Sequence, residues 1–296
     1  MLRFIADIRS LAFMAITTAL LIVLWMYGFE MSTWVFWSLY ALQLLMAVSV
    51  SVMTHNHQHL PMWRNKTMNF LTDNWLTVFY GFPIFAWIPT HNINHHVHIN
   101  KDEDYTKTYR YSEKNNLLTL LIYPSVSGYY QQPAVGAYLK DLRKTNRKKF
   151  YSTSFQIVAL VLWVGISLII DWQKALLFVV IPGQVSVYTV HVFNYLQHVH
   201  ADEESKFNNS RNFTGSILNF ILINNGYHTA HHVATGLHWS QLPDKHKELE
   251  PKIDPSLNVN DFGWFMFRNY VLGIFIPSLR TKSMRLDREQ KLATAA

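Results

Sequence analysis

Four long stretches of apolar residues stand out along the chain, and mostly polar segments separate them. A helix needs about 20 residues to cross the hydrocarbon core of a bilayer. The apolar stretches therefore predict transmembrane helices at residues 11–28, 34–53, 152–170 and 175–195. Only a few residues join the first helix to the second and the third to the fourth, so each pair predicts a helical hairpin.

Three shorter apolar stretches, at 75–89, 117–123 and 264–279, predict helices that do not span the membrane. We expect them in the protein core or at the membrane surface, and the third contains Arg268, which suits the level of the headgroups. The first long stretch lacks a small-residue cleavage site, so we expect it to be a membrane helix and not a signal peptide. No break in composition divides the chain, which predicts a single domain over 1–296.

The composition and the distribution of charge also indicate a membrane protein. Charged residues make up 15% of the 296 residues, whereas soluble domains contain about a quarter. Of the 26 Lys and Arg residues, only Lys174 lies in a hairpin connection. The positive-inside rule therefore predicts that both termini and the central segment are cytoplasmic, at either a bacterial inner membrane or the endoplasmic reticulum. The net charge of +7 then reflects topology, and no nucleic-acid partner is expected.

Histidine is concentrated near the predicted cytoplasmic ends of these helices. Fourteen of the 15 histidines fall within residues 55–59, 91–98, 191–200 and 228–238. The chain has no cysteine, which excludes thiolate metal sites, iron–sulfur clusters and a cysteine nucleophile. Neutral imidazole is the commonest metal ligand, so these windows predict a metal site.

The spacing within the windows selects the candidate ligands. Residues three or four apart share a helix face, and an adjacent pair can reach two sides of a site. His198 and Asn194 show the same spacing at the end of the fourth predicted helix, and His191 is a candidate hydrogen-bond partner one turn earlier. The boxes themselves supply His55, His59, His91, His95, His96, His228, His231 and His232. We expect the remaining histidines to be solvated, namely His57, His98, His200, His238 and His246.

Eight or nine imidazoles exceed the capacity of one ion, so the sequence predicts two metals. A hydrolytic zinc site usually shows an H-E-x-x-H motif, which is missing here. Imidazole alone does not choose between zinc, copper, iron and nickel. A metal pair close to apolar helices is placed to meet a lipid chain, and attack on an unactivated C–H bond requires the oxygen chemistry of iron. We therefore favour iron.

The ordered set of histidine boxes resembles that of the membrane fatty acid desaturase superfamily, whose members carry a non-haem diiron centre. The boxes are "HNHQH" at 55–59, "HNINHH" at 91–96 and "HTAHH" at 228–232, and "NYLQH" at 194–198 resembles a fourth element of the superfamily. The implied fold is all-α: four transmembrane helices in two hairpins, with a cytoplasmic helical cap that carries the dimetal site. The resemblance covers the chain from the first span to the last box.

The resemblance implies that nine histidines bind two iron ions: His55, His59, His91, His95, His96, His198, His228, His231 and His232. Asn194 is implied as a further ligand, either directly or through water. The implied reaction uses O2 and electrons from a separate carrier, of the ferredoxin or cytochrome b5 type, to place a double bond in a fatty acyl chain. Nearby acids are candidates to orient the ligands from behind: Asp102, Glu103, Asp104, Asp202 and Glu203.

Two other functions remain as alternatives. A diiron lipid or alkane hydroxylase shares the first hydrogen abstraction, although those hydroxylases typically carry Glu where this chain has Gln197. A metal transporter is disfavoured, because transporters usually place their ionisable ligands at the middle of the membrane. The acyl carrier, whether lipid, coenzyme A or carrier protein, is left open.

Overall fold

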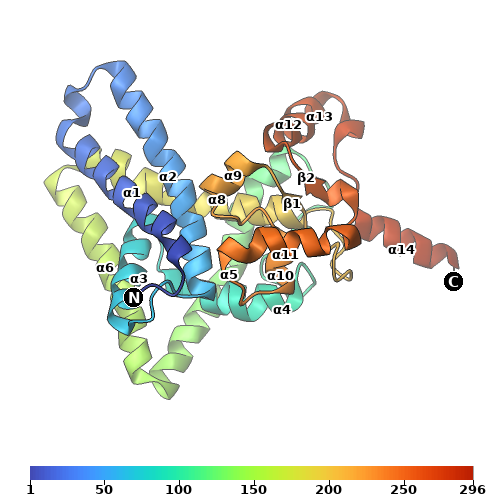
Figure 1. The fold of residues 1–296 in the computed structure, drawn as a ribbon, viewed down its shortest axis with the longest axis horizontal. Helices are drawn as coiled ribbons and strands as arrows, with labels where there is room; N and C mark the ends of the chain where they lie inside the picture. Colours follow the sequence, from blue (N-terminus) through green and yellow to red (C-terminus); the bar gives the residue numbers. More distant parts are fainter. Residues whose placement is uncertain (296) are drawn as a thin grey trace. The chain divides into compact units, whose positions relative to one another are not determined.

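The computed structural model describes residues 1–295, and most of these are helical (Figure 1), as the sequence predicts. The chain forms two compact units. Unit 1 contains Met1–Ile88 and Val135–Val190, and unit 2 contains Pro89–Ala134 and the chain from His191 onward. Helices α5 (Leu117–Thr145) and α8 (Ile181–His198) each contribute to both units. The single domain stays a prediction.

Unit 1 is built from long helices. Helix α1 packs along α2, and α3 packs against both α2 and α6. The helices of this unit are α1 (Ile8–Tyr27), α2 (Thr33–His59), α3 (Lys66–Tyr80), α6 (Arg147–Ile170) and α7 (Trp172–Ala175). Short helical turns complete it: η1 (Ile5–Asp7), η2 (Gly28–Glu30), η3 (Ile84–Ala86) and the π-helix η5 (Leu176–Val180).

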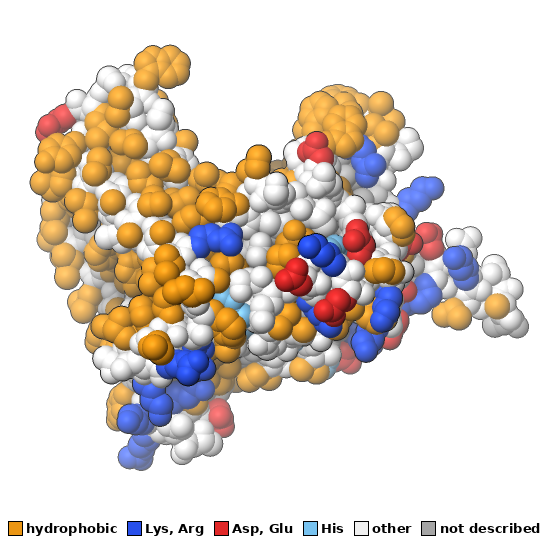
Figure 2. All heavy atoms as spheres, in the orientation of Figure 1, with side chains coloured by type: hydrophobic (Ala, Val, Ile, Leu, Met, Phe, Trp, Pro, Cys, Tyr) orange, Lys and Arg blue, Asp and Glu red, His pale blue; other side chains and the backbone are white. Residues whose placement is uncertain are grey.

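Four helical stretches are long and apolar enough to cross a membrane: Ile5–Glu30, Thr33–His59, Arg147–Ile170 and Trp172–His198. They contain the four predicted spans and extend each by several residues. On α6, Val161, Ile166 and Ile169 are 64%, 53% and 86% exposed. Side chains of this kind cover much of the face of unit 1 in Figure 2. Exposed apolar surface on this scale is unfavourable in water and suits contact with lipid.

The core of unit 1 includes a close crossing of two backbone segments. Gly81 ends α3 with a φ of 79°, and its Cα approaches Gly183 in α8. A Cβ on Gly81 would lie 2.7 Å from the Gly183 Cα and 2.9 Å from its carbonyl carbon. The crossing therefore requires glycine at residue 81 for both its conformation and its size.

We expect Gly81→Ala to lower the stability of the protein by about 1–3 kcal/mol, because the added methyl overpacks the crossing. The measurement is thermal unfolding of the purified protein in detergent. Gly165→Ala in α6 is the matched control, since a Cβ there meets no atom within 4 Å. Equal melting temperatures for the two variants would contradict the prediction.

Unit 2 is assembled from shorter elements around the ends of α5 and α8. Its core brings together Leu120 and Tyr123 of α5, Tyr195 and Leu196 of α8, and Phe213. The two-residue strands β1 (Asn212–Phe213) and β2 (Asn258–Val259) pair in parallel. The helices are η4 (Ile88–His95, a π-helix that begins at the last residue of unit 1), α4 (His96–His98), α9 (Ser216–Ile221), α10 (His228–Val233), α11 (Leu242–Leu249), α12 (Phe262–Met266), the π-helix η9 (Phe267–Leu272), α13 (Gly273–Phe275) and α14 (Met284–Ala295). Short 3-10 turns join them: η6 (Trp239–Gln241), η7 (Glu250–Lys252), η8 (Pro255–Leu257) and η10 (Pro277–Leu279).

The shorter apolar stretches are largely helical, but their ends are misplaced. The stretch at 75–89 is not one helix, because α3 ends at Tyr80 and a turn at Gly81 separates it from η3. The stretch at 117–123 is only the beginning of the 29-residue α5, whose first turn is capped by Asn116 through a 3.0 Å bond from the Thr119 amide. The basic run at 140–149 closes α5 and opens α6. Apolar content alone underestimates such a helix, because most of its length is amphipathic or polar.

Candidate metal centre

Four histidines from three segments of unit 2 converge in one buried group, which we call group B: His95, His198, His228 and His232. One ring nitrogen of each lies within 4.8 Å of those of the others. The Nε2 atom of His198 lies 2.9 Å from that of His228 and 3.2 Å from that of His232. His95 and His198 are fully buried, and His228 is 2% exposed.

The hydrogen bonds behind the rings fix which nitrogen faces the group. His198 donates its Nδ1–H to the backbone carbonyl of Asn209 at 2.9 Å, so its Nε2 carries the lone pair. His95 donates its Nδ1–H to Asp104 at 2.7 Å. The Nε2 of His95 is buried and forms no hydrogen bond within the described residues. Burial, and then the charge of His228, lowers the pKa of His232 well below its usual value, which keeps the ring neutral as a ligand must be.

A second group lies beside the first and consists, in unit 2, of His91, His96 and His231; we call it group A. The Nε2 of His96 lies 3.0 Å from that of His91 and 3.1 Å from that of His231. The ring centroids of His96 and His232 are 4.6 Å apart, so the two groups are adjacent. The adjacent pairs of the second and third boxes each divide between the groups, as the sequence predicts for adjacent histidines.

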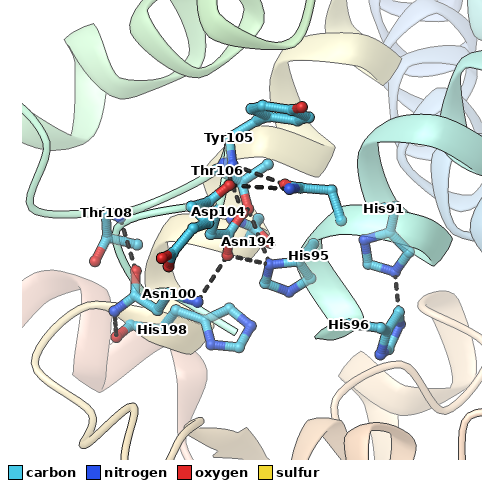
Figure 3. A network of polar contacts seen from close by, with 12 residues as sticks. His91, His95, His96, Asn100, Asp104, Tyr105, Thr106, Thr108, Asn194 and His198 are labelled. Atoms are coloured by element: carbon cyan, nitrogen blue, oxygen red, sulfur yellow. Dashed lines mark hydrogen bonds and ion pairs between the residues drawn. The ribbon is translucent and has the colours of Figure 1, made fainter. Parts of the chain in front are cut away.

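The π-helix η4 determines how the second box is divided. A π-helix closes its turns between residues i and i+5. His91 and His96 therefore lie one turn apart, and their rings meet in group A (Figure 3). His95, which is four residues from His91, joins the other group. The α-helical spacing rule would have placed His91 and His95 together, so this grouping was missed.

The third box is positioned by a backbone contact and an amide side chain. A Cβ on Gly226, two residues before the box, would lie 2.2 Å from the Phe213 carbonyl oxygen, so this residue must be glycine. The Asn212 side chain accepts the Thr229 amide at 2.9 Å, in the first turn of α10. Strand β1 thus holds the helix that carries His228, His231 and His232.

The first box lies in unit 1, on the last turns of α2. His55 and His59 share one helix face, and their ring centroids are 4.8 Å apart. The ring of His55 also stacks on Trp87 at 5.1 Å. The rule that residues four apart share a helix face therefore holds for this pair.

Asp104 is the acid that orients a candidate ligand. Its Oδ2 accepts the His95 Nδ1–H and the Asn100 amide, each at 2.7 Å, and its Oδ1 accepts the amide and hydroxyl of Thr106 (Figure 3). Burial raises the pKa of this carboxyl, but the charge of His95 and the hydrogen bonds outweigh that effect and lower it well below its usual value. Asp104 is therefore ionised at neutral pH and holds the ring of His95 in one tautomer.

The other four acids named from the sequence make different contacts. Asp102 is exposed and pairs with Lys107. Asp202 and Glu203 pair with Arg288 near the C-terminus. Glu103 contributes its backbone carbonyl, which accepts the Asn94 side chain at 2.9 Å. Nothing in the sequence separates Asp104 from its neighbours, because the distinction arises from the chain fold after His98.

Asn194 lies close to the site and joins a network of hydrogen bonds that reaches His95 (Figure 3). Its amide nitrogen donates to the Tyr123 hydroxyl at 2.6 Å, and that hydroxyl donates to the Thr106 carbonyl at 2.6 Å. Thr106 in turn contacts the His95 Nδ1 and Asp104. Tyr123 and Thr106 were not identified from the sequence, and only the three-dimensional network reveals them.

Several histidines predicted to be solvated are buried, so that prediction is wrong for them. His57 is 1% exposed and lies 3.2 Å from Asp73. His238 and His246 are 3% and 4% exposed. His98 and His200 are partly exposed. His191 accepts a hydrogen bond from Gln131 at 3.0 Å. Polar sequence context misled the prediction, because segments folded over these side chains bury them within their own units.

The nitrogen geometry fits metal ions. Two nitrogens bound to one metal at about 2.1 Å are about 3.0 Å apart at a right angle and about 3.4 Å apart at the tetrahedral angle. The Nε2 separations of 2.9–3.2 Å match the right angle. The groups are therefore compact enough to hold metal ions.

The comparison with protein families gives one result. The sequence model of the family described as "Fatty acid desaturase" matches residues 31–264, which include all three histidine boxes. The comparison with curated proteins gave no match, and neither did the comparison with solved structures. The match covers most of the chain, and the buried histidine groups lie within it. The chain therefore belongs to the fatty acid desaturase family.

Proposed function

We propose that the protein is an O2-dependent fatty acyl desaturase that uses two iron ions held by histidines. The observation that carries the proposal is the pair of adjacent imidazole groups in unit 2, with nitrogens at the separation of neighbouring metal ligands. Membership of the fatty acid desaturase family and four membrane-type helices support it. The substrate is then a fatty acyl chain in or at the bilayer.

The assignment of ligands follows the two groups. We assign His95, His198, His228 and His232 to one iron, and His91, His96 and His231 to the other. His55 and His59 of the first box are assigned to the second iron as well, since they share a helix face and belong to the same set of boxes. Asn194 is assigned a position near the metals, where it binds directly or through water.

The residues of the chain prepare the site in two ways. Asp104 and the Asn209 carbonyl hold two rings with their Nε2 lone pairs turned inward. Burial keeps water away from His95, His198 and His228. The iron ions, when bound, supply the activation of O2, with electrons from a separate ferredoxin or cytochrome b5 type carrier. The overall change removes a pair of hydrogens from adjacent acyl carbons and gives a double bond and water.

The orientation in the membrane is also proposed. The distribution of Lys and Arg favours cytoplasmic termini and a cytoplasmic metal site. The two hairpins and the cap belong to the same proposal. An electron carrier in that compartment would then have direct access to the site.

The test is expression in a host that lacks its own desaturase, with fatty acids profiled by mass spectrometry and iron measured on the purified protein. We expect acyl products that have lost a pair of hydrogens. The His231→Ala variant, which loses a group A ligand, is expected to insert in the membrane but to form no product and bind less iron. A product with an added oxygen would replace desaturation by hydroxylation. The neutral Gln197, whose side chain donates to the Asn225 carbonyl at 2.9 Å, favours desaturation over hydroxylation.

A further inference from the structure

Unit 2 contains a buried arginine that has no acidic partner. Arg211 is 2% exposed, and its guanidinium donates to the carbonyls of Leu196 and Val199 at 2.7 and 3.2 Å. Its Nε forms no hydrogen bond, and no carboxylate pairs with it within the described part of the chain. Burial lowers the pKa of Arg211 to about 10, so the side chain is charged at neutral pH. A buried charge is unfavourable unless an opposite charge or several hydrogen bonds offset it.

Arg211 lines a cavity of about 720 Å³ near the C-terminal helix α14. This volume is within the usual range of ligand sites, which is roughly 300–1,000 Å³. Six basic residues line the cavity: Arg211, Arg268, Arg280, Lys282, Arg288 and Lys291. This basic cavity is distinct from the histidine groups, none of whose members line it.

The acidic residues of the basic cavity do not neutralise it. Three line it, of which Asp202 pairs with Arg288, and Asp254 accepts the amide and hydroxyl of Ser256. Asp287 is exposed on α14. Four of the cations that line the cavity lack carboxylate partners among residues 1–295, namely Arg211, Arg268, Arg280 and Lys282. Such a cavity is complementary to an anion with several acceptor oxygens.

The wall that carries Arg268 has an unpartnered apolar face. Residues 262–275 form one continuous helical segment, α12–η9–α13. Trp264, Val271 and Phe275 on this segment are 54%, 45% and 78% exposed, whereas Phe265 and Tyr270 are buried. Figure 2 shows hydrophobic side chains gathered over α12 and α13, with basic side chains nearby. A helix with an exposed apolar face and a flanking basic residue is typical of segments that lie in the interface of a membrane.

We propose that the basic cavity binds the phosphate of an anionic membrane phospholipid. A phosphate accepts several hydrogen bonds, and Arg is well suited to bind it in a fork geometry. The apolar face beside the cavity favours a lipid as the source of the phosphate over a soluble phosphate compound, because it provides a surface for the lipid chains. Basic pockets next to a membrane are known to bind anionic headgroups.

The test is isothermal titration calorimetry on the full chain purified in detergent. The probes are short-chain phosphatidylglycerol, short-chain phosphatidylcholine and inorganic phosphate. We expect the anionic lipid to bind most tightly, and Arg268→Gln to weaken its binding about tenfold through the loss of a charge-assisted contact. Lys282→Gln, at an exposed residue of the same cavity, is the second variant, because it cannot disturb the core.

Lys247→Gln is the matched control. It removes one positive charge from an exposed residue of α11 that does not line the cavity, so binding is expected to be unchanged. Unaltered binding in both Arg268→Gln and Lys282→Gln would overturn the proposed site. Inorganic phosphate binding as tightly as the lipid, with the same loss in these variants, would overturn the assignment to a lipid.

Discussion

The His198→Ala variant is expected to lose more than about 100-fold of its activity, because loss of even an indirect metal contact typically costs 10–100-fold. His198 is fully buried and lies at the centre of group B, with its Nε2 next to those of His228 and His232. Its loss removes one of the four nitrogens of this group. We therefore expect the purified variant to hold one iron in place of two, measured by elemental analysis, with product formation measured in the same preparation.

His98→Ala provides the control for the first prediction. His98 ends the segment that carries His95 and His96, but it is partly exposed and belongs to neither group. Its substitution is expected to leave both iron content and activity close to those of the unaltered protein. Full iron occupancy with normal turnover in His198→Ala would remove this histidine from the site.

The Asp104→Asn variant is expected to show about a 10–100-fold loss of iron affinity or activity, the usual effect of removing a partner that orients a ligand. The carboxylate accepts four hydrogen bonds, one of them from His95. An amide cannot accept at its nitrogen, so at least one buried donor is left without a partner and the ring of His95 is free to turn. The measurement is the rate of iron loss to a chelator, together with activity of the iron-loaded protein.

Asp102→Asn is the matched control for Asp104. It makes the same chemical change two residues earlier, in an exposed side chain that pairs with Lys107. We expect normal iron retention in this variant. If the two variants lost iron at the same rate, Asp104 would have no role in orienting the ligand, and the buried network would serve stability alone.

Local patterns predicted most of the fold that lies in long helices. Each of the four apolar stretches is a helix of membrane length, because burial in lipid requires apolar side chains on every face. The same rule failed for α5, where only the first turns are uniformly apolar. Polar context also failed for His57 and His246, since a side chain in a polar segment can still be covered by a helix distant in sequence.

For the candidate metal centre, too, local patterns predicted one part and missed another. Spacing identified the candidate ligands, because imidazoles one turn apart must face the same side. It did not show how the histidines divide between groups A and B, since that depends on the π-helical turn at 88–95. The role of Asp104, the network through Thr106 and Tyr123, and the unpaired Arg211 also lie outside any local pattern.

By itself, the sequence determined the number of apolar helices and the chemical type of the candidate ligands, because both depend on side chains and on local helical geometry. Tertiary structure decided which nitrogens meet. His95 and His198 are far apart in the chain, yet their ring centroids are 4.7 Å apart. Such a contact depends on the packing of short helices in unit 2, whose directions are set by the turns at Gly226 and after His98. Those directions result from many weak contacts acting together, and no short segment of the sequence encodes them.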